Sequence, residues 1–211
     1  MKVLVLISGR GTNLEALLQA IDDGRCAANV VSVLSDRDAA GLEHARRRDV
    51  PTRVVAFRKD DRDAWAGELL AAIDACTPQL IVLAGFMRVL DPRIIARYAG
   101  RILNVHPSLL PAFPGLHATR RAIEAGVRVS GCTVHVVDEG VDTGRVLAQA
   151  AVAVAPDDDA ASLQARIQRA EHRLLPAVVD AVARGRVDPT TGAWRGVVAP
   201  DSFFSFPLVE P

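Results

Sequence analysis

Two polar residues near the middle of the chain have types and spacing suited to catalysis. Asn104 and His106 lie two positions apart in the stretch Leu103–Pro111. If this stretch is the end of a β-strand, both side chains leave the same face. An amide that donates without ionising then stands beside an imidazole that titrates near neutral pH. The same pair also fits a plain strand end, at which the histidine caps a backbone carbonyl.

A second candidate site precedes the first predicted helix. Val3–Ile7 is an unbroken β-prone run, typical of a strand buried in a parallel sheet. Ser8–Gly11 breaks this run, and Thr12–Glu15 has the pattern of a capping box that opens a helix. A strand, a glycine loop and a helix N-terminus together present backbone N–H groups to a phosphate. A tight turn before a well-capped helix is the simpler alternative.

The glycine loop also invites comparison with dinucleotide-binding loops. That fingerprint needs a third glycine where Leu14 stands, so that helix and strand can approach closely. Asp36, which follows a predicted strand, imitates the acid that binds the ribose. The missing glycine favours a phosphate site over a dinucleotide site.

Strand-like and helix-like segments alternate along the chain. This predicts an α/β fold with a mostly parallel, Rossmann-like, doubly wound sheet. Strands are expected at 3–7, 30–34, 53–56, 80–84 and 101–105, and helices at 12–22, 41–49, 61–75, 91–98 and 118–125. The strands at 130–137 and 145–154 should pair antiparallel. A long C-terminal helix follows, and Pro176 is expected to kink it or to end its first part.

Pro107 should end the strand that carries Asn104 and His106, because proline has no N–H for the ladder. In open parallel sheets, ligands bind beyond the carboxyl ends of the strands. Both candidate sites lie at such ends. We therefore expect them to face one crevice.

The composition limits the classes of partner. The chain has 211 residues, half of them hydrophobic, and 25 basic residues balance 25 acidic ones. This balance gives no reason to expect nucleic acid or an anionic membrane as a partner. No apolar run approaches the ~18 residues of a membrane span. Cys26, Cys76 and Cys132 are odd in number and widely spaced, which indicates reduced thiols in a cytoplasmic protein.

Two charged stretches remain. Arg62 begins a predicted helix within a mixture of charges typical of a solvated surface, unless a phosphate at the glycine loop recruits it. Asp138–Gly144 carries three carboxylates in a hairpin-like loop. The loop lacks the twelve-residue spacing of a calcium hand, so no metal is expected.

Taken together, these motifs resemble the folate-dependent formyltransferases, most closely those that act on glycinamide ribonucleotide in purine synthesis. The matching stretches are Ile7–Leu14, Leu83–Arg88, Leu103–Pro111 with Pro114–Gly115, and Gly131–Gly144. The resemblance implies 10-formyltetrahydrofolate as co-substrate and a single domain over 1–211. It also implies a mononucleotide-binding half at about 1–100, a catalytic and folate-binding half at about 101–187, and a tail at 188–211.

Carried over position by position, the resemblance implies roles for individual residues. The catalytic residues would be Asn104, His106 and Asp142. The ribonucleotide would bind Gly11, Thr12, Asn13, Arg62 and Glu171, with Arg62 on its phosphate. The folate would meet Met87, Arg88, Val89, Leu90, Val137, Asp138, Glu139, Gly140, Val141 and Asp142. Four positions or pairs depart from the family's usual residues: Arg10, Thr12, Arg145 and Ala118–Thr119.

The implied reaction is attack by a primary amine on a formyl carbon, with negative charge growing on the formyl oxygen. Asn104 and a protonated His106 are suited to donate to that oxygen. Asp142, if it reaches His106, should raise the histidine pKa from ~6.5 toward working pH. The protein then needs neither a nucleophile nor a metal. Its partners would be the two small substrates, and it would be a monomer or a homodimer.

Other members of the superfamily fit the sequence less well. A methionyl-tRNA formyltransferase should carry an RNA-binding domain and a basic face, and a formyltetrahydrofolate hydrolase should carry an N-terminal regulatory domain. Here the predicted first strand begins at Val3, the chain is neutral, and we expect neither domain. A nucleotide-binding module without catalysis is the remaining alternative from another class.

Overall fold

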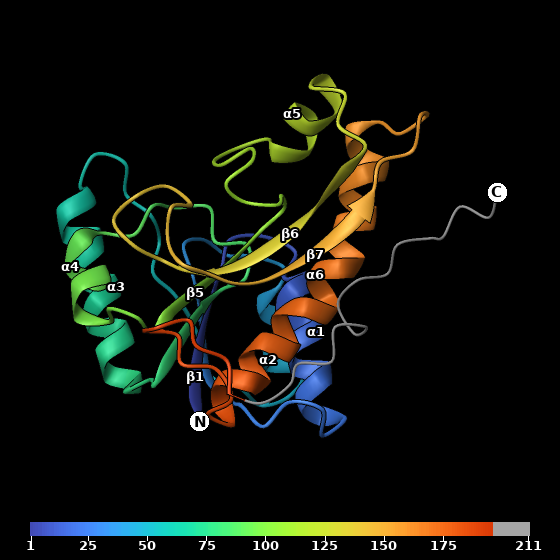
Figure 1. The fold of residues 1–211 in the computed structure, drawn as a ribbon. Helices are drawn as coiled ribbons and strands as arrows, with labels where there is room; N and C mark the ends of the chain where they lie inside the picture. Colours follow the sequence, from blue (N-terminus) through green and yellow to red (C-terminus); the bar gives the residue numbers. More distant parts are fainter. Residues whose placement is uncertain (196–211) are drawn as a thin grey trace.

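A computed structural model describes residues 1–195 and shows one seven-stranded sheet with helices on both faces (Figure 1). The strand order is β3-β2-β1-β4-β5-β6-β7. The strands are β1 Lys2–Ile7, β2 Asn29–Ser35, β3 Thr52–Val54, β4 Leu80–Leu83, β5 Ile102–His106, β6 Val129–Val136 and β7 Val146–Ala153. Strands β1 to β5 are parallel, and β6 is antiparallel to both β5 and β7. The predicted mostly parallel sheet and its antiparallel last pair are confirmed.

The helices form two layers (Figure 1). They are α1 Thr12–Asp22, α2 Leu42–Arg46, α3 Arg62–Cys76, α4 Pro92–Arg97, α5 Ala118–Glu124 and α6 Ala160–Ala183. Helices α3 and α4 lie on one side of the sheet, and α1, α2 and α6 on the other. Of the two outcomes expected at Pro176, a kink or an end, the end does not occur, because α6 continues through it. Packing along the buried stripe of this helix outweighs the hydrogen bond that proline cannot make.

The first strand shows why both faces need helices. Val3, Val5 and Ile7 belong to the core beneath α1 and α6, whereas Leu4 and Leu6 belong to the core beneath α3. All five are fully buried. Each contributes about 1.5–3 kcal/mol relative to an exposed side chain. An unbroken apolar run is therefore what this position in a two-sided sheet requires.

The start of the predicted tail lies against the last strand. Val187 and Trp194 form an isolated antiparallel bridge, and Trp194 Nε1 donates to the carbonyl of Leu147 in β7 at 3.0 Å. The rest of the tail, with Phe203, Phe204 and Phe206, lies outside the described residues. Within residues 1–195, no helix is long and apolar enough to span a membrane.

Candidate active site

Asn104 and His106, the candidate catalytic pair, both lie at the end of β5. Asn104 pairs with Leu83 of β4 on one side and with His135 of β6 on the other, and His106 is the last residue of the strand. The strand stops before Pro107, as predicted. Asp142, from the loop between β6 and β7, reaches the same place in the left-handed conformation, with φ of 54°.

Three side chains predicted to act together do meet. Asp142 Oδ2 lies 3.2 Å from His106 Nδ1, and Asp142 Oδ1 lies 3.5 Å from Asn104 Nδ2. The N–H of Gly115 also donates to Asp142 Oδ2, at 2.7 Å. This contact ties the proline-rich loop after β5 to the carboxylate. The geometric expectation for the triplet holds, and its catalytic role stays a prediction.

Both ring nitrogens of His106 face acceptors. Nδ1 faces Asp142, and Nε2 lies 3.0 Å from the carbonyl oxygen of Phe113. A ring that carries a proton on each nitrogen can donate to both acceptors. The contact with Phe113 also agrees with the simpler interpretation of the sequence, in which the histidine caps a backbone carbonyl. Burial nevertheless lowers the pKa of His106, although Phe113 and Asp142 oppose the change. The predicted rise of this pKa is therefore wrong in direction, because removal of the ring from water outweighs its partners.

Sequence reasoning missed a fourth polar member of the cluster. His135 Nδ1 lies 3.1 Å from the carbonyl of Val136, so Nδ1 carries the proton and Nε2 accepts from Asn104 Nδ2 at 3.1 Å. Nε2 also lies 3.5 Å from Asp142 Oδ1. The polar contact with His135 lowers the pKa of Asp142 despite burial, helped by the N–H of Gly115 and by His106. Only the cross-strand register brings His135 here, and a single sequence does not reveal that register.

The glycine loop borders a cavity of ≈ 400 Å³, which we call the glycine-loop cavity. Its lining includes Ser8, Gly9, Arg10, Gly11, Thr12, Asn13, Arg37, Gly85, Met87, Val105, Pro107, Gln164, Gln168 and Glu171. Val105 in β5 and Pro107 directly after it, the two neighbours of His106 in sequence, both line this cavity. The end of β5 therefore forms one wall of this cavity, while Asn104 faces the other way.

The helix start at this cavity differs from the predicted capping box. Gly11 is the N-cap of α1, with φ of 69° and no side-chain capping bond. Thr12 Oγ1 instead accepts from Gln168 at 2.8 Å, and Glu15 binds Arg48 at 3.0 Å. A Cβ on Gly11 would lie 2.8 Å from the Cα of Gly41. Glycine at this position thus permits the left-handed turn and the close approach of α2.

Asn13 and Glu171 meet at the inner end of the glycine-loop cavity. Asn13 Nδ2 donates to Glu171 Oε2 at 2.9 Å, and both side chains are buried. Burial raises the pKa of Glu171, and the bond from Asn13 opposes that rise. The structure thus brings together four of the five residues predicted to bind the ribonucleotide.

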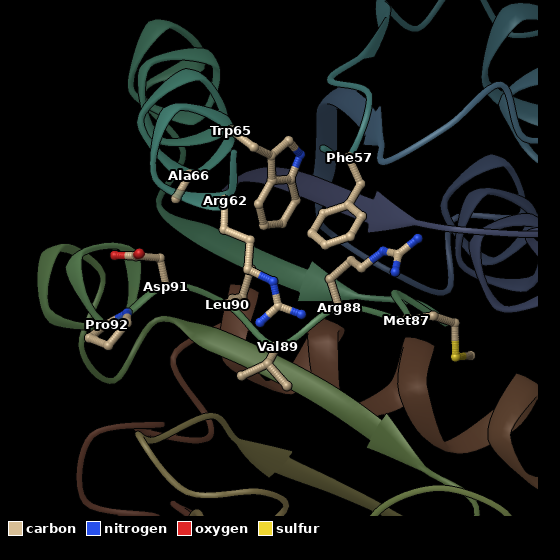
Figure 2. A pocket seen from close by; sticks show the side chains of 10 residues that line it. All are labelled: Phe57, Arg62, Trp65, Ala66, Met87, Arg88, Val89, Leu90, Asp91 and Pro92. Carbon is tan, nitrogen blue, oxygen red and sulfur yellow. The ribbon is translucent and has the colours of Figure 1, made fainter. Parts of the chain in front are cut away.

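Arg62 is the exception. It lines a separate cavity of ≈ 380 Å³, which we call the Arg62 cavity, together with Phe57, Trp65 and residues 87–92 (Figure 2). It is not part of the lining of the glycine-loop cavity. In this structure Arg62 therefore lies apart from the glycine-loop cavity, and the group that it binds stays a prediction. The start of α3 points into a different hollow on the other face of the sheet.

The predicted folate residues gather around a third cavity of ≈ 120 Å³, the Asp142 cavity. Its lining includes Arg88, Val89, Leu90, Asn104, His135, Val137, Asp138, Gly140, Val141 and Asp142. Met87 lines the other two cavities, and Glu139 lines none of the three. The segment 87–90 thus borders all three cavities. Within residues 1–195, no cluster of His, Cys, Asp or Glu is placed to hold a metal ion.

Comparison with known proteins shows the family of this chain. A protein-family model described as formyl transferase matches residues 1–179. The chain belongs to the formyl transferase family. Phosphoribosylglycinamide formyltransferase of Escherichia coli is 43% identical over 189 residues, which cover 89% of each chain. The crystal structure of glycinamide ribonucleotide transformylase 1 from Symbiobacterium toebii matches with a TM-score of 0.84 and 44% identity, over 89% of each chain.

Some relatives are much longer. The trifunctional purine biosynthetic protein adenosine-3 of Drosophila melanogaster is 46% identical over 188 residues, which cover 87% of this chain but 14% of that protein. The chain therefore spans a small part of the length of some relatives and most of the length of others. The family predicted from the sequence motifs is confirmed.

Proposed function

We propose that this formyltransferase moves the formyl group of 10-formyltetrahydrofolate to the primary amine of glycinamide ribonucleotide. The observation that carries the proposal is the position of β5 between two cavities. Val105 and Pro107 line the glycine-loop cavity, while Asn104 lines the Asp142 cavity. The two substrates can therefore meet at the end of one strand. The names of the similar E. coli and S. toebii proteins support the choice of amine.

The ribonucleotide belongs in the glycine-loop cavity. The first N–H groups of α1 have no partner within the helix, and they suit the phosphate. Gln168 and the buried pair Asn13–Glu171 offer polar atoms to the ribose and the glycinamide. The amine then lies near Pro107, beside His106.

The formyl donor belongs in the other two cavities. Its pterin fits the Asp142 cavity, between the backbone of segment 87–90 and the 137–142 loop. Its negatively charged tail extends into the Arg62 cavity, where Arg62 offers a guanidinium group (Figure 2). Arg62 thus serves the donor in this proposal, because it lines the Arg62 cavity and not the glycine-loop cavity.

Transfer proceeds without a bond to the protein. The amine nitrogen attacks the formyl carbon, and the carbonyl electron pair moves to the oxygen. The amine proton passes to the folate nitrogen through the paired His106 and Asp142, and the folate carbon–nitrogen bond then breaks. The products are a formamide and tetrahydrofolate. Asn104 and His106 stabilise the oxyanion, a contribution of ~3–4 kcal/mol for one such donor.

The cluster must rearrange before it can donate to the oxyanion. His106 Nε2 is bonded to Phe113, and the Asn104 amide faces His135 and Asp142. We therefore place a movement of the 107–117 loop in the sequence of binding events. Catalytic hydrogen bonds in active sites often reach their final geometry only when the substrate binds.

The reaction suits a reducing, cytoplasmic setting. All three cysteines, Cys26, Cys76 and Cys132, are free thiols. Burial raises the pKa of Cys132 to about 12, so this thiol is unreactive at neutral pH. We assign no role in transfer to any of them.

A formyl-transfer assay tests the proposal. The protein is incubated with 10-formyltetrahydrofolate and glycinamide ribonucleotide, and then with each substrate omitted. We expect tetrahydrofolate and the formamide to appear in equal amounts, and only when both substrates are present. Formate released without the amine would indicate a hydrolase instead, and no reaction with either mixture would contradict the proposal.

A further inference from the structure

A buried carboxylate outside the predicted site connects the glycine loop to the segment that borders all three cavities. Asp36 follows β2, and its side chain is 0% exposed. Arg88 Nε donates to its Oδ2 at 2.6 Å, and Arg37 Nε donates to its Oδ1 at 3.3 Å. The hydroxyl of Ser8, in the glycine loop, is close enough to this carboxylate to lower its pKa. An ionised group so fully removed from water needs such partners to remain charged.

The hydroxyl of Ser8 also contacts segment 87–90. The N–H of Met87 donates to Ser8 Oγ at 2.8 Å. Asp36 therefore holds Arg88 directly, while its neighbour Ser8 holds Met87. Together, Asp36 and Ser8 contact two consecutive residues of segment 87–90.

Aromatic packing also holds this arginine, whose side chain extends beside Phe57 (Figure 2). The guanidinium carbon of Arg88 lies 4.0 Å from the ring centroid of Phe57. Phe57 packs edge-on against Trp65, with centroids 5.0 Å apart. The N–H of Phe57 donates to the backbone carbonyl of Asp36 at 2.8 Å. The backbone and the side chain of Asp36 thus hold both members of the Phe57–Arg88 stack.

The carboxylate of Asp36 is ionised at neutral pH. Burial alone would raise its pKa, but the hydrogen bonds from Arg37 and Arg88, together with the nearby Ser8 hydroxyl, outweigh burial and leave the pKa below its ordinary value. Its negative charge offsets the charge of Arg88. Arg88 is thereby an anchored part of the cavity wall.

We propose that Asp36 is a positioning residue for formyl transfer. Together with Ser8, it holds Met87 and Arg88 so that the backbone of segment 87–90 keeps the shape against which the formyl donor binds. This inference rests on the proposed function, and Asp36 itself touches neither substrate.

The test compares two buried carboxylates. Asp36→Asn keeps the side-chain volume and removes the charge. Asp180→Asn is the matched control, because Asp180 is also buried, accepts from Arg184 at 2.8 Å, and lines none of the three cavities. We expect both variants to melt at a lower temperature. Only Asp36→Asn should raise the KM for the formyl donor, by about tenfold, the equivalent of one lost hydrogen bond, with kcat reduced less than about threefold.

A second variant keeps the test decisive if Asp36→Asn does not fold. Ser8→Ala removes the link to Met87 and leaves the carboxylate in place. We expect it to raise the donor KM by about threefold, and the double variant to resemble Asp36→Asn alone, because both substitutions act through one network. The same donor KM in Asp36→Asn and Asp180→Asn, or an unchanged KM in Ser8→Ala, would overturn the proposal.

Hydrogen exchange separates this inference from the proposed function. The Nε–H of Arg88 is identified by NMR as the signal that Arg88→Lys removes. We expect it to exchange slowly in the wild type and in Asp180→Asn, and at least about tenfold faster in Asp36→Asn. Equal exchange in all three would refute the anchoring by Asp36. A wild-type protein that transfers no formyl group would contradict the proposed function while this exchange still reports the anchor.

Discussion

Replacing Asp142 by asparagine removes one charge from the centre of the cluster and little else. Asp142 Oδ2 accepts from Gly115 at 2.7 Å and lies 3.2 Å from His106. An asparagine oxygen can keep both contacts, and its NH₂ group takes the place of Oδ1, whose contacts with Asn104 and His135 are long, at 3.5 Å. The fold should therefore tolerate the substitution. The proton relay should not tolerate it, because a neutral amide lacks the negative charge that stabilises the His106 imidazolium.

The expected size follows from the role of the group. Loss of general acid–base help typically lowers turnover ~10²–10⁴-fold. We expect kcat to fall by about 10³, which corresponds to about 4 kcal/mol in the activation barrier. The KM for the ribonucleotide should stay within about threefold, because Asp142 does not line the glycine-loop cavity.

Steady-state kinetics, with calorimetric binding of each substrate, measure both quantities. Asp74→Asn serves as the control, because Asp74 accepts from the Tyr98 hydroxyl at 2.6 Å and lines none of the three cavities. It should leave kcat unchanged. If Asp142→Asn retained kcat within about tenfold of the wild type, the relay would not pass through Asp142.

Three further predictions follow from individual contacts. Burial, with Asp74 beside it, raises the pKa of Tyr98, the single tyrosine of the chain, to about 12. Ultraviolet titration of Tyr98 should therefore show a midpoint near 12 in the folded protein and near ~10 in urea. The free energy of unfolding should fall as the pH rises between these two values, because the tyrosine of the unfolded chain loses its proton first. Gly11→Ala should raise the ribonucleotide KM more than about tenfold, because the new Cβ would lie 2.8 Å from the Cα of Gly41, where α2 begins. The control is Gly24→Ala, at a glycine that also has a positive φ, of 72°, but has no atom within 4 Å of the new Cβ. It should only reduce stability, by ~1–2 kcal/mol in thermal melts. Arg62→Ala should raise the KM for the formyl donor at least about tenfold and leave the KM for the ribonucleotide unchanged. The opposite pattern would indicate that Arg62 binds the phosphate of the ribonucleotide.

The sequence predicted the elements of the fold well because burial leaves a direct pattern. A strand covered on both faces must be apolar throughout, so Val3–Ile7 and Leu80–Leu83 were identifiable without a structure. Proline placed two boundaries, since Pro107 follows the last residue of β5 and Pro92 begins α4. These signals are local, and the chain obeys them.

Long-range contacts override local signals at the points where the predictions fail. Thr12 has a capping pattern, yet its hydroxyl accepts from Gln168, a residue far along the sequence. Pro176 should interrupt a helix, yet it is buried within α6. Such outcomes depend on the packing partner, which a local pattern does not contain.

The candidate site divides in the same way. Asn104 and His106 share a strand, so their common face followed from spacing alone. Asp142 was assigned through family resemblance, and His135 was missed because it joins the cluster through the β5–β6 register. The lowered pKa of His106 depends on burial of its ring, which no charge pattern in the sequence indicates.

The central claim is that the formyl group passes directly from donor to amine at the end of β5. The most direct measurement uses a donor whose formyl oxygen is ¹⁸O, followed by mass spectrometry of the product and of the intact protein. Direct transfer predicts a formamide that retains the full label and a protein of unchanged mass. Label diluted by solvent, or a formyl group attached to the protein, would contradict it.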